Sequence, residues 1–476
     1  MRVLMLEFNE LCPSLMDRFI AEGHLPNFER LRDHSLAMVT DAEEAPPNLE
    51  PWIQWVTVHT GLPYAEHKCF KLNDGGRLKQ RRLWDEVGAA GGKAWVCGSM
   101  NAGIDPSAFA GHFMPDPWAS EVEAHPEGYF KPYLDVVRAY VQEHSGRPQV
   151  TPLMLAKFIR FMVANGLRYE TIVATMKQLA SERRSNVKWR RAMILDRLQW
   201  DLFAAIYRRE QPQLATFFLN STAHFQHFHW REMTPDIFLN KPSEADTLAF
   251  RDTIRAGYEN MDRIVGKALD LADDRTAIVL ATALSQQPML TYEDQGGRQI
   301  FRHHDIDQLL NFAGIDAPHE YRPVMSQQFL LHFEDADAAL AASEKLGSLM
   351  LDDGQPVMWA VPEPATPNIV NAGCLVSANP DGATVQAGSS GRQMAFDELF
   401  YPLEALRSGM HHPDGLFWIS APGITPREVE EKVPLTAVHP TLLTLLGLEG
   451  GEKSAPSFLT TGHAAAAVEN PRPLVA

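Results

Sequence analysis

The sequence predicts an α/β protein in which a mostly parallel central sheet is flanked by helices. Three stretches carry this prediction. Residues 3–6 are a short apolar run, and apolar residues with helical spacing follow at 13–20. Residues 83–97 pass from a helical pattern through a glycine-rich turn into a strand-like run, and residues 214–219 form another apolar run of strand length. Short apolar runs that alternate with helical patterns are typical of parallel sheets with both faces covered.

The other N-terminal elements support the same architecture. Pro13 stands near the first turn of the predicted helix over 13–20, where a missing N–H group costs nothing. Residues 25–31 predict a second short helix. Residues 52–61 follow a proline-rich turn, and Gly61 is expected to end a helix there because glycine readily adopts a left-handed conformation.

A first insertion into this core spans residues 121–210. Within it, residues 152–163 and 189–200 have helical apolar spacing and predict a helical lid. Arginines and lysines cluster between and within these helices at positions 183, 184, 188, 190, 191 and 197, on a chain whose formal net charge is −17. Two of them, Arg190 and Arg191, are candidates to bind an anionic substrate, because guanidinium groups bind carboxylates and phosphates bidentately. The alternative is an ordinary solvated helix face.

A second insertion, residues 310–400, predicts a small α+β accessory subdomain. Its pattern is a strand at 328–333, a helix at 336–350 and a strand at 357–361. Residues 362–391 are rich in Pro, Gly and Asn and predict a loop or a short hairpin. The resulting division of the chain is core at 1–120, lid at 121–210, core at 211–309, accessory subdomain at 310–400, core at 401–450 and a poorly ordered tail at 451–476.

Composition excludes several classes of protein. The net charge of −17 argues against a general nucleic-acid binder, which normally has a basic surface. The four cysteines show no CxxC spacing and are expected to be reduced thiols, as in the cytoplasm. No apolar run approaches the roughly 20 residues of a membrane span, and the N-terminus lacks the pattern of a signal peptide. We therefore expect a cytoplasmic protein without a membrane partner.

The chemistry is expected where the strand at 214–219 ends. Three histidines follow it within six residues, at positions 224, 227 and 229. Ligands and catalytic groups of open α/β sheets collect at the carboxyl ends of the strands. A single histidine there would more often be a packed structural residue, but three so close together favour a site.

Several motifs resemble one known family. "LPNFERLR" at 25–32, "HTGLPYAEH" at 59–67 and "LWDEVGAAGGKAWV" at 83–96 occur in the order seen in type I phosphodiesterase/nucleotide pyrophosphatase proteins, which belong to the alkaline phosphatase superfamily. The stretch around His227 resembles that family's TDxxxH segment. Residues 408–415 resemble its late G-x-H-x-P-x-G motif, and residues 416–423 and 438–447 resemble the strand and helix that follow. The resemblance implies an alkaline-phosphatase-like fold, two divalent metals, and a Thr or Ser nucleophile.

The chain departs from the family pattern at most of these functional positions. Asn9 stands where the family has an Asp at the end of the first strand, and Ala223 replaces the Asp of the TDxxxH segment. Residues 282–285 lack the SDHG ligands, and the nucleophile position falls near Glu50, where there is no hydroxyl. His227 and His411 remain, and they correspond to the two histidine ligands of one metal site.

Three interpretations stay open. The first is a hydrolase-like enzyme with a remodelled single-metal site for zinc, manganese or iron, acting on an anionic phospho- or sulfo-type small molecule or glycan. The second is an inactive binding or scaffold protein, and the third is a metal-free transferase or lyase. In the first, the third metal ligand comes from His224, Glu10, Glu50 or His59, because two imidazoles alone bind a divalent ion weakly. Asn9, Glu10, Glu50 and His59 are the candidate catalytic residues, and Gln286 and Gln287 join the two arginines as candidate substrate-binding residues. No nucleotide cofactor is inferred, and the sequence does not define the oligomeric state.

Overall fold

The central sheet of the protein has nine strands. The structure, a computed structural model, describes residues 1–72, 74–119, 121–142, 150–324, 326–364, 366–378, 380–388, 391–403, 405–448 and 457–459. The strand order is β19-β2-β18-β6-β1-β5-β3-β4, with β20 paired to β2. The strands are β1 (Arg2–Phe8), β2 (Leu36–Asp41), β3 (Ala94–Cys97), β4 (Gly111–Met114), β5 (Leu214–Leu219), β6 (Thr276–Ala281), β18 (Asp414–Ser420), β19 (Arg427–Glu428) and β20 (Val433–Pro434).

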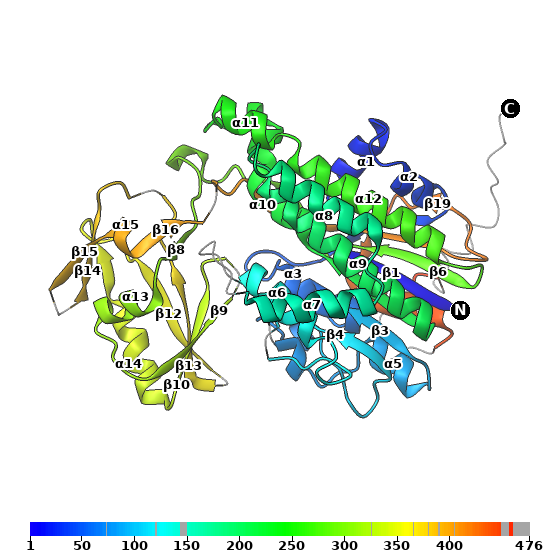
Figure 1. Ribbon diagram of the computed structural model, residues 1–476, viewed down its shortest axis with the longest axis horizontal. Helices are drawn as coiled ribbons and strands as arrows, with labels where there is room; N and C mark the ends of the chain where they lie inside the picture. Colours follow the sequence, from blue (N-terminus) through cyan, green and yellow to red (C-terminus); the bar gives the residue numbers. More distant parts are fainter. Residues whose placement is uncertain are drawn as a thin grey trace.

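The sheet is mostly parallel, as predicted. Strand β1 lies between β5 and β6 and is parallel to both, and β3 is parallel to β4 and β5. Only β18 runs antiparallel to its two neighbours, β2 and β6. Helices flank the sheet (Figure 1), so the predicted fold class is confirmed.

Alternation along the central strands builds one core on each face of the sheet. In β1, Leu4, Leu6 and Phe8 face one core, and Val3 and Met5 face the other, because successive side chains of a strand point to opposite sides. The first core contains α1 (Pro13–Ala21), α2 (Pro26–Asp33), α6 (Lys131–Gln142), α9 (Arg191–Glu210), α10 (Ser221–Met233) and α12 (Thr253–Leu271). The second contains α3 (Pro51–Thr60), α5 (Leu83–Ala89) and α16 (Val438–Leu446).

The predicted end of α3 at Gly61 is confirmed. Gly61 has a φ of 71° and its N–H donates to the Thr57 carbonyl at 2.8 Å. This turn requires a positive φ, which glycine adopts at little energetic cost because it has no Cβ atom. The other end of α3 begins at Pro51, with Glu50 in the N-cap position.

Residues 301–400 form a separate apolar cluster beside the main core. A four-stranded sheet has the order β12-β13-β10-β9, and a three-stranded sheet has the order β11-β14-β15. Their elements are β9 (His319–Pro323), β10 (Phe329–Phe333), α14 (Ala336–Gly347), β11 (Leu349–Leu351), β12 (Met358–Glu363), β13 (Thr366–Cys374), β14 (Thr384–Ala387) and β15 (Arg392–Ala395). Figure 1 shows this part at one end of the molecule.

Of the two structures predicted for residues 362–391, a loop or a short hairpin, the hairpin agrees with the antiparallel pairing of β12 and β13. Residues 362–391 are not mainly loop, because β13 crosses the stretch as a nine-residue strand between β12 and β10. Val370 and Ala372 of β13 are fully buried, so packing against the cluster overrides the local turn signals of the Pro, Gly and Asn residues. The predicted tail at 451–476 lies outside the described residues, apart from 457–459.

Smaller elements connect these parts. They are α4 (Tyr64–His67), α7 (Pro152–Ala164), α8 (Tyr169–Ser181), α11 (Glu244–Phe250), β7 (Ser285–Pro288), β8 (Phe301–His303), α13 (Ile306–Ala313), α15 (Phe396–Leu399), β16 (Phe400–Pro402) and β17 (Gly409–His412). Among the described residues, no helix is both long enough and apolar enough to cross a bilayer.

A buried carboxyl group joins three helices of the first core. Asp196 in α9 accepts hydrogen bonds from Ser221 of α10 at 2.6 Å and from Asn260 of α12 at 2.9 Å. Burial raises the pKa of Asp196 to about 7, although both donors favour the charged form. The folded protein therefore holds this proton up to near-neutral pH.

Stability should depend on pH through Asp196. The folded-state pKa lies above the ordinary value of 3.8, so ionisation penalises the folded state as pH rises from about 4 to about 7. The Asn side chain of Asp196→Asn cannot ionise. The difference in free energy of unfolding between this variant and the wild type should therefore shift by about 2–3 kcal/mol in favour of the variant when the pH rises from 5 to 8. Denaturant unfolding at the two pH values measures this. Asp236→Asn, at a fully exposed position, is the control and should show no such trend; equal pH profiles for wild type and Asp196→Asn would contradict the prediction.

Candidate metal centre

Three adjacent strands end at the same edge of the sheet and deliver the polar residues of the site. Asn9 and Glu10 follow β1, Asn220 follows β5, and β7 follows β6. The backbone turns sharply at Glu10, whose φ of 61° is uncommon for a residue with a Cβ atom. Gln226 donates to the Glu10 carbonyl at 2.7 Å and holds this turn.

A two-stranded ribbon brings in the second part of the chain. Strand β17 pairs antiparallel with β7, which places His411 opposite Gln286. Gly409 at the start of β17 lies close to the backbone of α10: a Cβ atom there would come within 2.3 Å of the Gln226 carbonyl oxygen. The glycine therefore permits the approach that brings His411 to the helix bearing His227.

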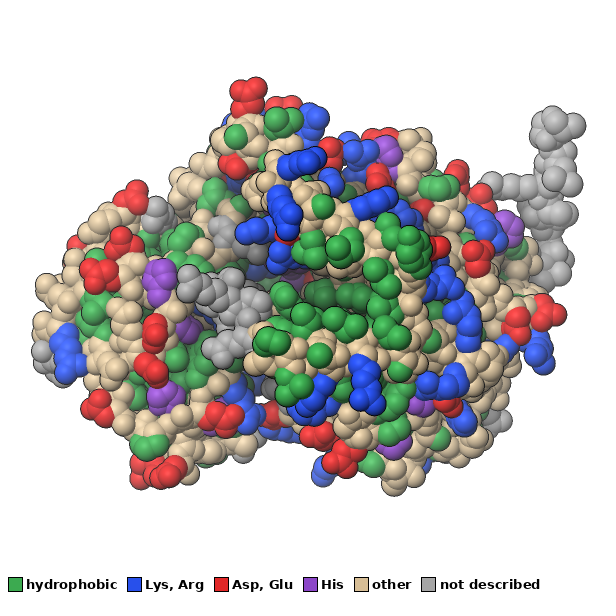
Figure 2. Space-filling model, in the orientation of Figure 1, with side chains coloured by type: hydrophobic (Ala, Val, Ile, Leu, Met, Phe, Trp, Pro, Cys, Tyr) green, Lys and Arg blue, Asp and Glu red, His purple; other side chains and the backbone are tan. Residues whose placement is uncertain are grey.

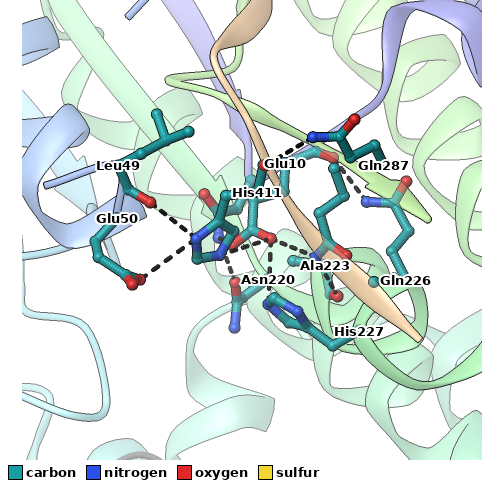
Figure 3. A network of polar contacts seen from close by, with 12 residues as sticks. Glu10, Leu49, Glu50, Asn220, Ala223, Gln226, His227, Gln287 and His411 are labelled. Atoms are coloured by element: carbon teal, nitrogen blue, oxygen red, sulfur yellow. Dashed lines mark hydrogen bonds and ion pairs between the residues drawn. The ribbon is translucent and has the colours of Figure 1, made fainter. Parts of the chain in front are cut away.

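His227 and His411 lie side by side, although 184 positions separate them in the sequence. Their ring centroids are 5.3 Å apart. Between them, Glu10 Oε2 lies 3.3 Å from His227 Nε2 and 3.6 Å from His411 Nε2 (Figure 3). Among the described residues, these three form the one group of His, Cys, Asp and Glu side chains whose ligand atoms converge within 4.8 Å of one another.

These distances suit a divalent metal. Zinc ligands at about 2.0–2.1 Å in tetrahedral geometry stand about 3.3–3.4 Å from one another. His411 Nδ1 donates to the Leu49 carbonyl at 2.9 Å, which leaves a lone pair on Nε2. That Nε2 atom is buried without a hydrogen-bond partner. A backbone acceptor on the other ring nitrogen is also the usual arrangement of a metal-bound histidine.

Glu10 is a buried carboxylate. Burial by itself raises its pKa, but the two imidazoles and the Gln286 amide outweigh that effect and lower the pKa to about 2. Gln286 donates to Glu10 and to the Ala223 carbonyl, and Asn9 donates to Glu10 at 2.8 Å. The negative charge is therefore fixed in place, as a metal ligand requires.

His227 has a partner that opposes metal binding. Arg407 Nη2 lies 3.1 Å from His227 Nδ1, and because a guanidinium group only donates, Nδ1 accepts and the ring proton sits on Nε2, facing Glu10. Burial, then Arg407, lowers the pKa of His227, so the ring is neutral. For Nε2 to bind a metal, the proton must move to Nδ1 and Arg407 must release the ring.

Removing this partner should tighten metal binding. We expect Arg407→Gln to raise Zn²⁺ affinity about tenfold or more, because the variant loses both the donor on Nδ1 and a positive charge near the centre. Titration calorimetry with Zn²⁺ measures the change. Arg407→Lys keeps the charge and is the matched comparison; an unchanged affinity in Arg407→Gln would show that Arg407 does not compete with the metal.

Glu50 lies on the outer side of His411. Its Oε2 atom is 3.4 Å from His411 Nδ1, and 29% of its side chain is exposed. Burial raises the pKa of Glu50 to about 8, against the opposing effect of Arg407. A partly exposed carboxyl group with a raised pKa is typical of residues that transfer protons.

The structure does not bring His59 or His224 into this group. His59 is nine residues beyond Glu50 at the far end of α3, about 13 Å along the helix axis. It is buried there with Glu7 at 2.9 Å and between the rings of Trp55 and Trp84. His224 is exposed on α10 with its ring against Phe228. Of the four proposed third ligands, Glu10 has the position for that role.

Of the other predicted residues, two have hydrogen bonds at the site and two arginines lie without a contact to it. Asn9 links the site to the core, since its amide donates to Asn220 at 2.7 Å and its oxygen accepts from Trp55 at 2.8 Å. Gln287 donates to the His411 carbonyl at 3.4 Å. Arg190 lies over the Trp189 ring and Arg191 pairs with Glu182, so their role in substrate binding stays a prediction without a contact to Glu10, His227 or His411.

Sequence reasoning missed Arg407 and Gln226. Arg407 directly precedes the 408–415 motif, and Gln226 directly precedes His227. Each was therefore adjacent to a recognised motif, which was the available signal. The orientations of these two side chains depend on how closely β17 approaches α10, and no local sequence pattern reveals that distance.

A comparison with known protein families identifies the family of the chain. The model of the type I phosphodiesterase / nucleotide pyrophosphatase family matches residues 3–343. The chain belongs to this family, and the resemblance predicted from its motifs is confirmed. Membership supports a hydrolase-like role toward an anionic substrate. No curated protein matches the chain in sequence.

Solved structures with a similar overall arrangement are distant in sequence. Murine ectonucleotide pyrophosphatase / phosphodiesterase 5 is 11% identical, with 98% of this chain and 100% of that chain covered and a TM-score of 0.42. The human protein of the same name is 10% identical, with 98% and 99% covered and a TM-score of 0.42. Phosphonoacetate hydrolase from Sinorhizobium meliloti 1021, in complex with phosphonoformate, is 13% identical, with 93% and 95% covered and a TM-score of 0.40.

Proposed function

We propose that the protein is a hydrolase that cleaves an anionic phospho- or sulfo-type ester of a small molecule or glycan at a single-metal centre. The observation that carries the proposal is the position of Glu10 Oε2, 3.3 Å from His227 Nε2 and 3.6 Å from His411 Nε2. Glu10 would thus replace the carboxylate that the TDxxxH segment loses at Ala223. Zinc, manganese and iron all accept this set of two imidazoles and one carboxylate.

The residues around the centre have separate proposed roles. Glu10, His227 and His411 would hold a divalent ion, which would supply Lewis acidity at this point. Glu50 is the proton-transfer group, because its carboxyl adjoins the centre and is partly open to solvent. Arg407, once released from His227, is placed to bind an anionic oxygen of the substrate.

Metal analysis of the full-length protein, purified without chelator, tests the proposal. We expect about one zinc, manganese or iron per chain, and release of phosphate or sulfate from an anionic ester that chelation abolishes and the metal restores. A protein that neither contains nor binds any of these metals would overturn the single-metal centre.

A second function is favoured by one observation. The contact of Arg407 with His227 Nδ1 satisfies the ring without a metal, as in a binding protein that has kept the fold and lost catalysis. In that case the same preparation would contain no metal, would not bind Zn²⁺ in calorimetry, and would still bind an anionic ligand through Arg407. The metal content separates the two functions.

Ordinary phosphodiesterase chemistry should be weak in this protein. The α3 N-terminus, where the family nucleophile is expected, holds Glu50 at the N-cap and Pro51 at the first helical position, and neither has a hydroxyl. We expect kcat/KM for a generic aryl phosphodiester below about 10 M⁻¹ s⁻¹, well under the range of 10⁴–10⁸ M⁻¹ s⁻¹ usual for enzymes. Release of the nitrophenolate ion from such an ester measures it. Brisk metal-dependent turnover with a covalent burst phase would show that a side-chain nucleophile exists elsewhere.

A further inference from the structure

Two neighbouring helices of the insertion expose apolar side chains on their outer surface. On α7 these are Leu155, Ile159 and Val163, spaced four residues apart so that they form one stripe. Leu153, near the start of the same helix, is 64% exposed. A large part of each of these side chains, from 45% to 64%, is therefore exposed to solvent.

Helix α8 has a matching stripe. Tyr169, Ile172, Met176 and Leu179 follow the spacing of one helix face and are between 43% and 78% exposed. Together the two helices carry eight of the nineteen large hydrophobic side chains that are exposed among the described residues. Figure 2 shows hydrophobic side chains gathered around a hollow on this face of the molecule.

The inner faces of both helices already have partners. Phe158 and Met162 of α7 are buried, and the Phe158 ring stacks on Tyr133 of α6 with centroids 5.9 Å apart. Helix α8 packs against α9. The outer stripes are therefore a second apolar surface on helices that are already docked, and a contiguous exposed surface of this kind marks an interaction site.

The charge around the stripes identifies the partner. Residues 150–200 contain ten Lys and Arg residues but three Asp and Glu residues, on a chain with a net charge of −17. Most of these cations are exposed, including Lys157, Arg160, Lys177, Arg183 and Arg184. Blue side chains border the hollow in Figure 2. An apolar surface with a basic border complements a surface that is apolar inside and anionic outside.

We propose that the outer faces of α7 and α8 dock on a bilayer of anionic phospholipid. The stripes insert among the acyl chains, and the basic residues contact the headgroups. Neither contribution binds a membrane strongly alone, but the two together anchor peripheral proteins. The sequence led us to expect no membrane partner because no segment spans a bilayer; a docking face needs no spanning segment. A two-fold contact between copies of the chain fits less well, since it would bring the two basic borders together.

Flotation of the full-length protein with lipid vesicles tests this inference independently of any enzymatic activity. We expect at least tenfold more protein bound to vesicles of equal parts phosphatidylglycerol and phosphatidylcholine than to phosphatidylcholine alone. The excess should fall sharply in 1 M NaCl, where the screening length is only about 3 Å. Equal, negligible binding to both kinds of vesicle would overturn the proposal.

Two double variants locate the surface. Ile159→Ser/Met176→Ser should bind the anionic vesicles at least tenfold less than the wild type, with an unchanged melting temperature because both side chains are already exposed. Leu239→Ser/Leu248→Ser removes apolar side chains elsewhere that are more exposed still, at 75% and 71%, and should bind as the wild type does. Full binding by the first variant would overturn the assignment. So would light scattering that shows a dimer dissociated by the first variant, together with no vesicle binding, because the face would then join two copies of the chain.

Discussion

Glu10→Gln is expected to remove the metal from the protein and to abolish turnover with it. Glu10 provides the one negative charge among the three converging ligands, and its carboxylate is 2% exposed. Glutamine has the same shape but offers a neutral oxygen, which is a poor ligand beside two neutral imidazoles. Loss of a residue that only hydrogen-bonds to a metal ligand typically lowers metal affinity 10–100-fold. We therefore expect loss of the Glu10 ligand itself to lower it more than about 100-fold.

Metal content after dialysis and Zn²⁺ titration calorimetry measure this effect. Glu50→Gln makes the same chemical change 3.4 Å from His411 on the side where the ring nitrogen faces the Leu49 carbonyl, and it should retain the metal. His411→Ala removes a different ligand of the same centre, and its loss of metal should match that of Glu10→Gln. Full metal content in both ligand variants would refute the proposed centre, while normal circular dichroism would exclude misfolding as the cause of a loss.

The strands and the two histidines were predictable because local patterns determine them. The run at residues 3–6 lies within β1, and the pattern at 83–97 became α5 and β3. His227 and His411 each lie within a motif whose place in the family order was readable from the sequence. Their proximity follows because β5 and β6 flank β1, so that the segments after these strands meet at one edge of the sheet.

The identity of the third ligand was not predictable in the same way. Glu10, Glu50, His59 and His224 were equivalent in the sequence, and three-dimensional features separate them. The positive φ at Glu10 turns its side chain toward the two rings, whereas α3 carries His59 to its opposite end. The opposing role of Arg407 depends on the approach of a ribbon to a helix across 180 positions of sequence. Likewise, β13 was hidden by turn-forming residues that burial overrides.

Glu50→Gln should separate catalysis from metal binding. Glu50 adjoins the proposed centre without facing Glu10, and its carboxyl group can exchange a proton with substrate or water where the amide of glutamine cannot. We expect the variant to bind about one metal per chain with unchanged affinity while kcat falls by about 10²–10⁴, the usual contribution of a positioned acid or base. Steady-state kinetics on the same preparation used for metal analysis gives both values.

The comparison has a matched control in the same region. Glu66→Gln makes the identical substitution at an exposed position of α4 and should leave both kcat and metal content unchanged. If Glu50 were instead a metal ligand, its variant would lose the metal together with activity and would resemble Glu10→Gln. If Glu50 only capped α3, the variant would lose thermal stability with kcat preserved, but the Glu50 side chain makes no capping hydrogen bond. A preserved kcat in Glu50→Gln would therefore assign proton transfer to another group.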